Sequence, residues 1–362
     1  MANCASLKTI QEGVIPRQTD YNKFPLRSIA NQPPVFHFYQ SHNSDLGSNI
    51  YLEDKALNTS SVTLDSLVKL HKTIAFIIIR NDTILFEKYF EGYTDTSTVA
   101  SFSISKAFVA ALVGIAIDEK LIKSENDPLT DYLPEFKSNP DFDKITISHL
   151  LNHTSGIKFT DDEFDLQSDN AKFYWGNNLR HELKSLKTES LPGTYFHYSS
   201  ANPELLALIL ERLYGQNISF ILQEKIWKQL GMESPASWAL DRHDSLGIEK
   251  AFCCLYARAI DFAKFGRLYL NNGKWNDKQI VSQAWVDESV HQDLSGNNRL
   301  YFNDNLGITP LKYDSFYAVG LYGQYVFCNP EKNVIIVRFG NSNINYNSSY
   351  WLMTMLQIID QL

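Results

Sequence analysis

The chain has 362 residues, of which 44% are hydrophobic and 13% aromatic, and a formal net charge of −8 from 33 basic and 41 acidic side chains. This composition is typical of a globular protein with a sizeable core, built as one large domain or two interleaved ones, and it excludes a disordered chain. An acidic chain without a lysine–arginine cluster argues against nucleic-acid binding. No apolar run reaches the roughly 20 residues that a membrane span needs.

The cysteines and the first residues of the chain say little about its compartment. Four cysteines are too few for a disulfide scaffold at this length, and no Cys-x-x-Cys pair supports a thiolate zinc site. Cys253 and Cys254 are adjacent, and we expect that they do not pair with each other. The start lacks the charged and apolar regions of a signal peptide. Localisation therefore stays open between the cytoplasm and export with a trimmed signal.

The predicted elements begin with a polar, loop-like N-terminal arm over residues 1–60, wrapped on the main body. Thr73–Arg80 is a strongly β-prone run. A polar turn follows it, and then a second expected strand over Thr83–Glu91, so the two runs predict a hairpin. A helix is then expected to begin at Ser103 and to continue through the apolar run Ala107–Ile117.

Helical periodicity dominates the middle of the chain, and β character returns near its end. The pattern predicts helices over 147–152, 204–214, 219–230 and 259–270, strands over 324–328 and 334–339, and a closing helix over 349–362. This order predicts an α/β (α+β) fold in which helices flank an antiparallel sheet built from both chain ends. We expect an α/β domain from residues 61–135 and 240–362, and a helical domain over 136–239.

Ser103 and Lys106 form the motif with the clearest chemistry. A helix starting at Ser103 places Lys106 one turn later on the same face. A serine hydroxyl is a weak nucleophile until a base takes its proton, and a lysine can be that base when apolar burial lowers its pKa. Ser-x-x-Lys also occurs at 66–69 and 155–158, but only the copy at Ser103 opens a nearly all-apolar helix.

Two further stretches have a chemical and a structural interpretation. Tyr198 lies in a turn before an amphipathic helix, where a tyrosine close to a lysine can relay a proton; alternatively it is one of 19 tyrosines, half-buried and hydrogen-bonded. The two glycines of Ala318–Gln324 let the backbone pass close to a ligand, so that its amides can stabilise an oxyanion. A bulge or turn at the start of a strand is the alternative for that stretch.

His149 and His153 stand at i and i+4, a spacing that metal-binding helices use. No glutamate lies inside the pair and no third ligand follows at short spacing, so we interpret them as helix capping and packing. Metal-dependent hydrolysis through the pair is the alternative, and it predicts loss of activity with chelators. The acidic loop 161–165 is interpreted as solvated surface, with calcium binding as the alternative.

Taken together, three motifs resemble those of the penicillin-recognising serine hydrolases, and most of all the class C β-lactamase-like esterases. They are Ser103-x-x-Lys106, His149-Leu-Leu-Asn-His-Thr-Ser-Gly156 and Pro192-Gly193…Tyr198-Ser-Ser200, with supporting stretches at 127–135 and 261–268. Gly320–Gln324 is most similar to the branch that contains 6-aminohexanoate-dimer hydrolase. The similarity covers about residues 65–345.

The resemblance implies an active site in a cleft between an α/β domain and an inserted all-helical domain. It implies Ser103 as the acylated nucleophile, Lys106 as its proton acceptor and Tyr198 as the group that assists proton transfer to the leaving group. The backbone amides of Ser103 and Leu321 become the oxyanion hole, and Ser200 and Gly320 become substrate-binding positions. Neither a metal nor an organic cofactor is implied.

Two departures from the family pattern bear on the substrate. The third motif is usually Lys-Thr-Gly, or has His in place of Lys, whereas Ala318-Val319-Gly320 stands here. Without that cation the site lacks the group expected to grip a β-lactam or peptide carboxylate. The second motif usually ends in Asn, and Ser200 has a shorter reach and one donor fewer. Both changes favour esters or small amides.

The sequence thus predicts a serine hydrolase that forms an acyl-enzyme on Ser103, with a small-molecule ester or amide as its partner and no nucleic acid or membrane span. A true β-lactamase or D,D-peptidase is the first alternative, and a non-catalytic binding protein on the same fold is the second. Oligomeric state cannot be predicted from the sequence.

Overall fold

The computed structural model describes residues 15–41, 45–162, 165–291, 302–303, 305–309, 313–341 and 348–362. At its centre lies an eight-stranded sheet with the order β12-β13-β14-β15-β16-β5-β6-β2. The bounds are β2 (Tyr39–Gln40), β5 (Thr73–Arg80), β6 (Thr83–Tyr89), β12 (Phe302–Asn303), β13 (Leu306–Ile308), β14 (Phe316–Gly320), β15 (Gln324–Asn329) and β16 (Val334–Gly340).

The sheet joins the two ends of the chain, because β5 pairs antiparallel with β16. The predicted strand Thr73–Arg80 is confirmed, and the predicted strand 83–91 ends two residues early at Tyr89. Successive side chains of β5 point to opposite faces: Ile77 enters the core on one face, and Phe76 and Ile78 enter a second core on the other. Burial on both faces explains why this strand is a continuous apolar run.

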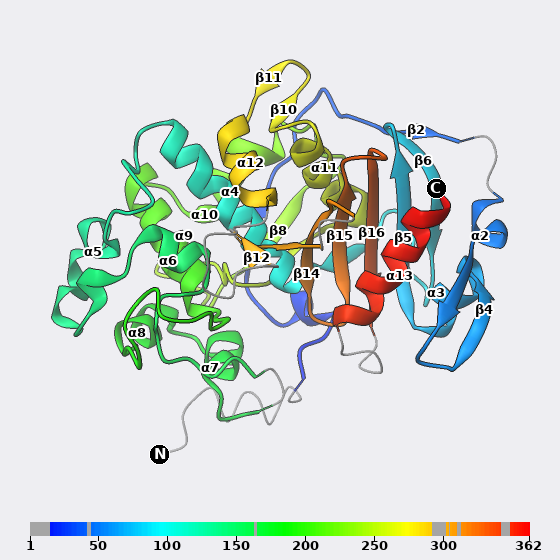
Figure 1. Cartoon of the computed structure of the whole chain (residues 1–362). Helices are drawn as coiled ribbons and strands as arrows, with labels where there is room; N and C mark the ends of the chain where they lie inside the picture. Colours follow the sequence, from blue (N-terminus) through cyan, green and yellow to red (C-terminus); the bar gives the residue numbers. More distant parts are fainter. Residues whose placement is uncertain are drawn as a thin grey trace.

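Helices cover both faces of the sheet. The second core contains α13 (Ser348–Gln361) and α3 (Leu64–Leu70), and α13 crosses the sheet in red in Figure 1. The opposite face packs against α11 (Ala259–Leu270), which has the predicted bounds, and contributes to the main core. Helix α4 (Ser105–Asp118) is buried along nearly its whole length and packs against α9 (Ala201–Tyr214).

A group of helices stands on the side of the molecule away from α13 (Figure 1). It comprises α5 (Leu129–Tyr132), α6 (Ile147–Leu151), α7 (Asp169–Trp175), α8 (Leu179–Lys184), α9 and α10 (Ile218–Leu222). The helix predicted over 219–230 is α10 followed by a π-helical turn over Gln223–Trp227. The predicted α/β fold with helices inserted between two chain ends that share one sheet is confirmed.

The loop-like character expected for residues 1–60 is wrong for several segments. β1 (Leu26–Ile29) pairs with β8 (Ala236–Ala239) in a second sheet, completed by β7 (Thr98–Ala100) and β9 (Leu255–Arg258). The strand that pairs with β1 lies far away in the sequence, so the local pattern of this polar stretch does not predict a strand. The remaining α-helices and strands of the described residues are α2 (Leu46–Asn49), β3 (Tyr51–Asp54), β4 (Thr59–Thr63), β10 (Lys274–Trp275), β11 (Lys278–Gln279) and α12 (Gln283–Val290).

The expectation that Cys253 and Cys254 stay unpaired is also wrong, because the two residues form a disulfide. Consecutive side chains of an extended strand point to opposite sides, which keeps neighbouring sulfurs apart. Cys254 instead has a left-handed backbone with φ of 69°, and this turn brings both side chains to one side.

Within the described residues, no single helix is both long and apolar enough to cross a membrane. The bent pair formed by α9 and the segment Ile218–Trp227 meets that length and composition together, and most of its residues are buried in the protein.

Candidate active site

Ser103 and Lys106 meet at the start of α4. Ser103 lies in a 3₁₀ turn over Phe102–Ile104, so the α-helix begins at Ser105 and not at Ser103 as predicted. Lys106 Nζ lies 2.8 Å from Ser103 Oγ and also donates to the carbonyl oxygen of Phe252 at 2.7 Å. Lys106 is only 2% exposed, whereas the lysines of the other two Ser-x-x-Lys stretches are exposed. Only the copy at Ser103 therefore forms a buried serine–lysine pair.

The Ser103 turn packs tightly against the end of β14. A Cβ added to Gly320 would lie 2.5 Å from the carbonyl oxygen of Ser101 and 3.2 Å from the nitrogen of Ser103, so only glycine allows this approach. The next residue, Leu321, therefore follows directly beside the serine. Phe102 has a φ of 44°, a backbone conformation that non-glycine residues rarely adopt and that recurs at functional sites.

Tyr198 faces the same lysine. The amino group of Lys106 lies 5.0 Å from the centroid of the Tyr198 ring, and that ring also stacks on His153, with 4.6 Å between the ring centroids. The amide of Ser199 donates to His153 Nδ1 at 3.0 Å, so Nε2 carries the ring proton and donates to Asn305 at 2.8 Å. Burial, reinforced by the charge of Lys106, lowers the pKa of His153 to about 3. His153 is therefore a neutral support for Tyr198.

Asp161 is drawn into the site, although the loop 161–165 was predicted to be solvated surface. Its Oδ2 accepts hydrogen bonds from the amide of Ser200 at 2.8 Å and from the Ser200 hydroxyl at 3.0 Å. Burial raises the pKa of Asp161, and the charge of Lys106 opposes that shift. The prediction was wrong for this residue because tertiary contacts, and not the local charge run, determine its surroundings. Residues 163 and 164 lie outside the described part of the chain.

Glu204, on α9, fixes the backbone that holds Lys106. Its Oε2 accepts from the amides of Ala251 at 2.7 Å and Phe252 at 3.3 Å, and the Phe252 carbonyl receives the lysine. The Ser105 hydroxyl donates to the carbonyl of Ala251 at 3.1 Å. Full burial raises the pKa of Glu204 well above its ordinary value. Glu204 and Ser105 therefore position Lys106 indirectly, by holding the backbone of Ala251 and Phe252.

Two spaces adjoin these groups. A cavity of about 20 Å³ has a wall formed by Pro16, Phe102, Ser103, Asn170, Tyr174, Ser200, Phe252, Cys253 and Leu321. A more open space of about 410 Å³ lies beside Tyr198, with Asp161, Glu189, His197 and Phe159 among its lining residues. The predicted residues Ser103, Ser200 and Leu321 therefore line one cavity. Lys106 contacts Ser103 but does not itself line that cavity.

The histidine pair has structural roles, as predicted. His149 Nδ1 accepts from the amide of Thr146, and the Thr146 hydroxyl accepts from the amide of His149, which closes a capping box at the start of α6. His153 packs on Tyr198 as described above. The described residues contain no group of three or more histidine, cysteine or carboxylate side chains placed to hold a metal ion.

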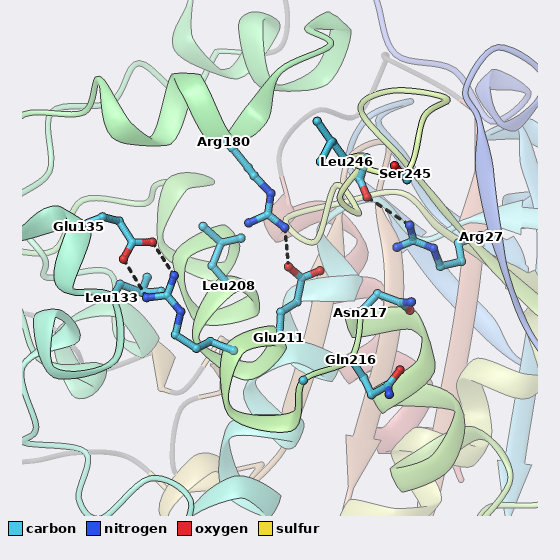
Figure 2. Close-up of a pocket in the computed structure, with 13 residues that line it drawn as sticks. Arg27, Leu133, Glu135, Arg180, Leu208, Glu211, Gln216, Asn217, Ser245 and Leu246 are labelled. Carbon is cyan, nitrogen blue, oxygen red and sulfur yellow. Dashed lines mark hydrogen bonds and ion pairs between the residues drawn. The ribbon is translucent and has the colours of Figure 1, made fainter.

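A wider groove of about 550 Å³ lies away from Ser103, between the end of α9 and the loop before β9 (Figure 2). Its charged side chains are already paired: Arg212 with Glu135 at 2.7 Å, Arg180 with Glu211 at 3.0 Å, and Arg27 with Glu249 at 2.6 Å. Burial, with the nearby carboxylate of Glu249, raises the pKa of Glu211 to about 7. These pairs join helices and loops. We therefore interpret the groove as a contact region between structural elements and not as a binding site, despite its size.

Comparison with known proteins identifies the family of the chain. The profile of the Beta-lactamase family matches residues 68–349. The chain belongs to the β-lactamase family. Among curated members, 6-aminohexanoate-dimer hydrolase of Paenarthrobacter ureafaciens is 26% identical over 312 residues, which cover 79% of this chain and 77% of that protein.

Solved structures of the β-lactamase family share the fold. A Bacillus anthracis protein assigned as a 6-aminohexanoate-dimer hydrolase superposes with a TM-score of 0.83 at 24% identity, covering 96% of this chain and 94% of that one. A class C β-lactamase variant gives a TM-score of 0.61 at 15% identity, covering 83% and 95%. EstCE1, described as a hydrolase with promiscuous acyltransferase activity, gives a TM-score of 0.61 at 17% identity, covering 82% and 95%. The chain is therefore a member of a hydrolase family with the β-lactamase and penicillin-binding-protein fold.

Sequence reasoning missed two parts of this site, the carboxylates of Asp161 and Glu204. Asp161 was assigned to solvated surface, and nothing in its local sequence places it near Lys106. The packing role predicted for His153 agrees with the structure, although its stacking on Tyr198 was not predicted. Glu204 is the first residue of the amphipathic segment 204–214, and only the structure shows that its carboxylate is buried. Such a residue needs a buried partner, and the structure supplies backbone amides.

Proposed function

We propose that this protein is a serine hydrolase that forms an acyl-enzyme on Ser103 and hydrolyses a carboxylic ester or small amide. The observation that carries the proposal is the 2.8 Å contact between Lys106 Nζ and Ser103 Oγ in a buried, apolar setting. A base in hydrogen-bond reach of a hydroxyl is the arrangement that activates serine nucleophiles. The family membership supports hydrolysis, and the serine chemistry is our inference.

Each step of this mechanism is assigned to a residue of the site. Lys106 acts as the base in its deprotonated form: it takes the proton of Ser103 as the serine oxygen attacks the carbonyl, while the Phe252 carbonyl accepts one lysine N–H and so orients the amine. The amides of Ser103 and Leu321 stabilise the oxyanion. The close contact of Gly320 with the Ser103 turn supports this role, because Leu321 follows Gly320 directly in the chain. Tyr198 passes the proton to the leaving group, and Ser200 and Gly320 contact the substrate. Water then releases the acyl group and restores Ser103.

The charges around the site favour an ester or simple amide over a β-lactam. Ala318 is buried in β14 and offers no cation at the position where the family motif has Lys or His. Asp161 adds a carboxylate near Lys106, which disfavours a substrate carboxylate there. We therefore expect little turnover of a chromogenic cephalosporin. The dimer of 6-aminohexanoate, which the Paenarthrobacter relative is named for, belongs in the first panel of small amides.

Labelling with a fluorophosphonate tests the proposal directly. Intact-mass and peptide mapping should show a single adduct on Ser103 in the wild type and none in Ser103→Ala, and the variant should hydrolyse no ester. An unlabelled but folded wild-type protein would favour the non-catalytic binding protein. Rapid cephalosporin turnover would favour the β-lactamase alternative.

A further inference from the structure

The turn between β14 and β15 carries Leu321, which lines the cavity of Ser103, and a buried side chain holds its carbonyl group. Gln324, the first residue of β15, donates from Nε2 to the carbonyl oxygen of Leu321 at 2.7 Å. The same side chain donates to the Gly340 carbonyl at 2.8 Å and accepts from the Gly340 amide at 2.7 Å. Gln324 is fully buried, so an amide shielded from water ties this turn to the end of β16.

Arg338, on β16, holds the other two residues of the turn. Its Nη1 donates to the carbonyl oxygens of Tyr322 at 2.7 Å and Gly323 at 2.6 Å. The guanidinium lies over the ring of Trp351, 3.6 Å from the ring centroid, and burial lowers the pKa of Arg338 to about 9. A buried charge is costly unless it is hydrogen-bonded, and the bonds of this one to the turn offset part of that cost.

The turn itself has an uncommon backbone. Tyr322 and Gly323 are both left-handed, with φ of 65° and 70°, and the pair formed by Gly320 and Gln324 closes the hairpin around them. A bulky residue such as tyrosine rarely adopts a positive φ, and it stays there only where its surroundings hold it. The hydrogen bonds to all three carbonyls of the turn supply that constraint.

These contacts fix both ends of the peptide unit that joins Gly320 to Leu321. Gly320 packs against the Ser101 carbonyl and the Ser103 nitrogen, and Gln324 holds the Leu321 carbonyl. A peptide unit is planar, so it turns as one body and only if the groups at its ends move. The direction of the Leu321 amide is therefore set before a substrate arrives. Donors fixed in advance stabilise a developing anion without a cost of reorganisation.

We infer that Gln324 is a positioning residue for the oxyanion: it holds the Leu321 amide in place, and Arg338 supports the rest of the turn. This inference rests on the proposed function, in which that amide is one of the two oxyanion donors. Loss of the Gln324 hydrogen bonds should weaken the stabilisation of the oxyanion and leave the contact between Lys106 and Ser103 as it is.

An ester and its thionoester, in which sulfur replaces the carbonyl oxygen, test the inference. Sulfur accepts hydrogen bonds weakly, so misplaced amide donors affect the ester much more than the thionoester. Gln324→Met keeps the length of the side chain and removes its hydrogen bonds. It should lower kcat/KM for p-nitrophenyl acetate by about 10²-fold and that for the thionoester by only a few-fold. The ratio of the two constants should therefore fall by about tenfold or more.

Asn329→Leu is the matched control, because Asn329 is a buried amide at the other end of the same strand. It donates to the Tyr313 carbonyl and to the Ser315 hydroxyl, both at 2.9 Å, and accepts from the Lys332 amide at 2.8 Å. The variant should lose stability and keep the wild-type ratio of ester to thionoester. If it lowered that ratio as much as Gln324→Met, a general loosening of the sheet would explain the effect and the inference would be wrong.

Fluorophosphonate labelling separates this inference from the proposed function. A folded wild-type protein without an adduct on Ser103 would overturn the proposed function, and with it the oxyanion that Gln324 is inferred to serve. A labelled and active wild type, with an unchanged ratio in folded Gln324→Met, would overturn the role of Gln324 alone. Gln324→Glu is the second variant if the first does not fold: it keeps an acceptor for the Gly340 amide, and its carboxylate cannot donate to Leu321. A wild-type ratio in that variant would equally overturn the inference.

Discussion

At the scale of single residues, the site depends on where one ammonium group is held. Lys106 contacts Ser103, the Phe252 carbonyl and the face of Tyr198 from a position shielded from water. Asp161 is its carboxylate neighbour, and neutral His153 stacks on the Tyr198 ring. The proposed roles of Lys106 and Tyr198 are therefore separable by substitution.

Lys106→Ala should lower kcat/KM for an activated ester by about 10²-fold or more, because it removes the base for Ser103. Lys69→Ala is a matched control: it removes an exposed lysine from another Ser-x-x-Lys stretch and should leave the rate unchanged. Stopped-flow ester hydrolysis measures both. A rate within a few-fold of wild type for Lys106→Ala would exclude the lysine as the base.

Tyr198→Phe should also cost about 10²-fold, since the ring and its stacking on His153 remain while the hydroxyl that relays the proton is lost. The loss should be larger for a small amide than for a p-nitrophenyl ester, whose leaving group needs no proton. Tyr195→Phe, at a more exposed tyrosine of the same segment, is the control. Near-full amidase activity in Tyr198→Phe would contradict the proposed role.

At the scale of elements, the site is a meeting of the 3₁₀ turn that carries Ser103 with the end of β14. Gly320 makes that contact possible, and Leu321 follows it directly. Glu204 on α9 holds the backbone at Phe252, and Asn170 on α7 forms part of the wall of the Ser103 cavity. Four elements far apart in the sequence thus meet around one hydroxyl group.

Gly320→Ala should reduce activity by about 10²-fold or more, because the added methyl group lies 2.5 Å from the Ser101 carbonyl and pushes β14 away from Ser103. Val319→Ala is the control, since Val319 packs toward the core on the α13 side of the sheet. Ester hydrolysis and circular dichroism should be measured together. Wild-type kinetics in a folded Gly320→Ala protein would show that the oxyanion amides lie elsewhere.

At the scale of the whole molecule, one sheet drawn from both chain ends carries the site, and ion pairs join the inserted helices to one another. Two of these ion pairs, Arg180–Glu211 and Arg212–Glu135, lie in the groove of Figure 2, and the side chain of Glu211 is only 14% exposed. The pKa of Glu211 is raised from 4.5 to about 7, so the folded state binds its proton more tightly than the unfolded state. Its stabilising contribution is complete below the unfolded pKa of 4.5 and is lost as the pH rises through about 7.

Glu211→Gln should therefore raise the free energy of unfolding at pH 8, by up to about 3 kcal/mol, and change it little at pH 4.5. The glutamine keeps an acceptor for Arg180 and removes the charge that burial penalises. Urea denaturation at the two pH values measures the effect. A destabilised Glu211→Gln protein at pH 8 would mean that the ion pair with Arg180 outweighs the burial penalty.

The sequence predicted much of this fold and the core of the candidate site. Thr73–Arg80 and Ala259–Leu270 form the elements that their local patterns predict, because each fills buried positions along its own length. Ser103 and Lys106 are close because three residues separate them in a helical turn. Strand β1 was missed because its partner β8 is remote in sequence, and the Cys253–Cys254 disulfide because it depends on a single left-handed residue.

By itself the sequence determined the fold class, the order of elements and the serine–lysine pair, since these depend on periodicity and on spacing within one turn. Only the tertiary structure decided that Asp161 lies near Lys106, that Glu204 holds Phe252 and that Asn170 lines the cavity of Ser103. Each of these contacts joins segments distant in the chain, and their positions follow from how the helices and the sheet pack. Local sequence carries no record of that packing.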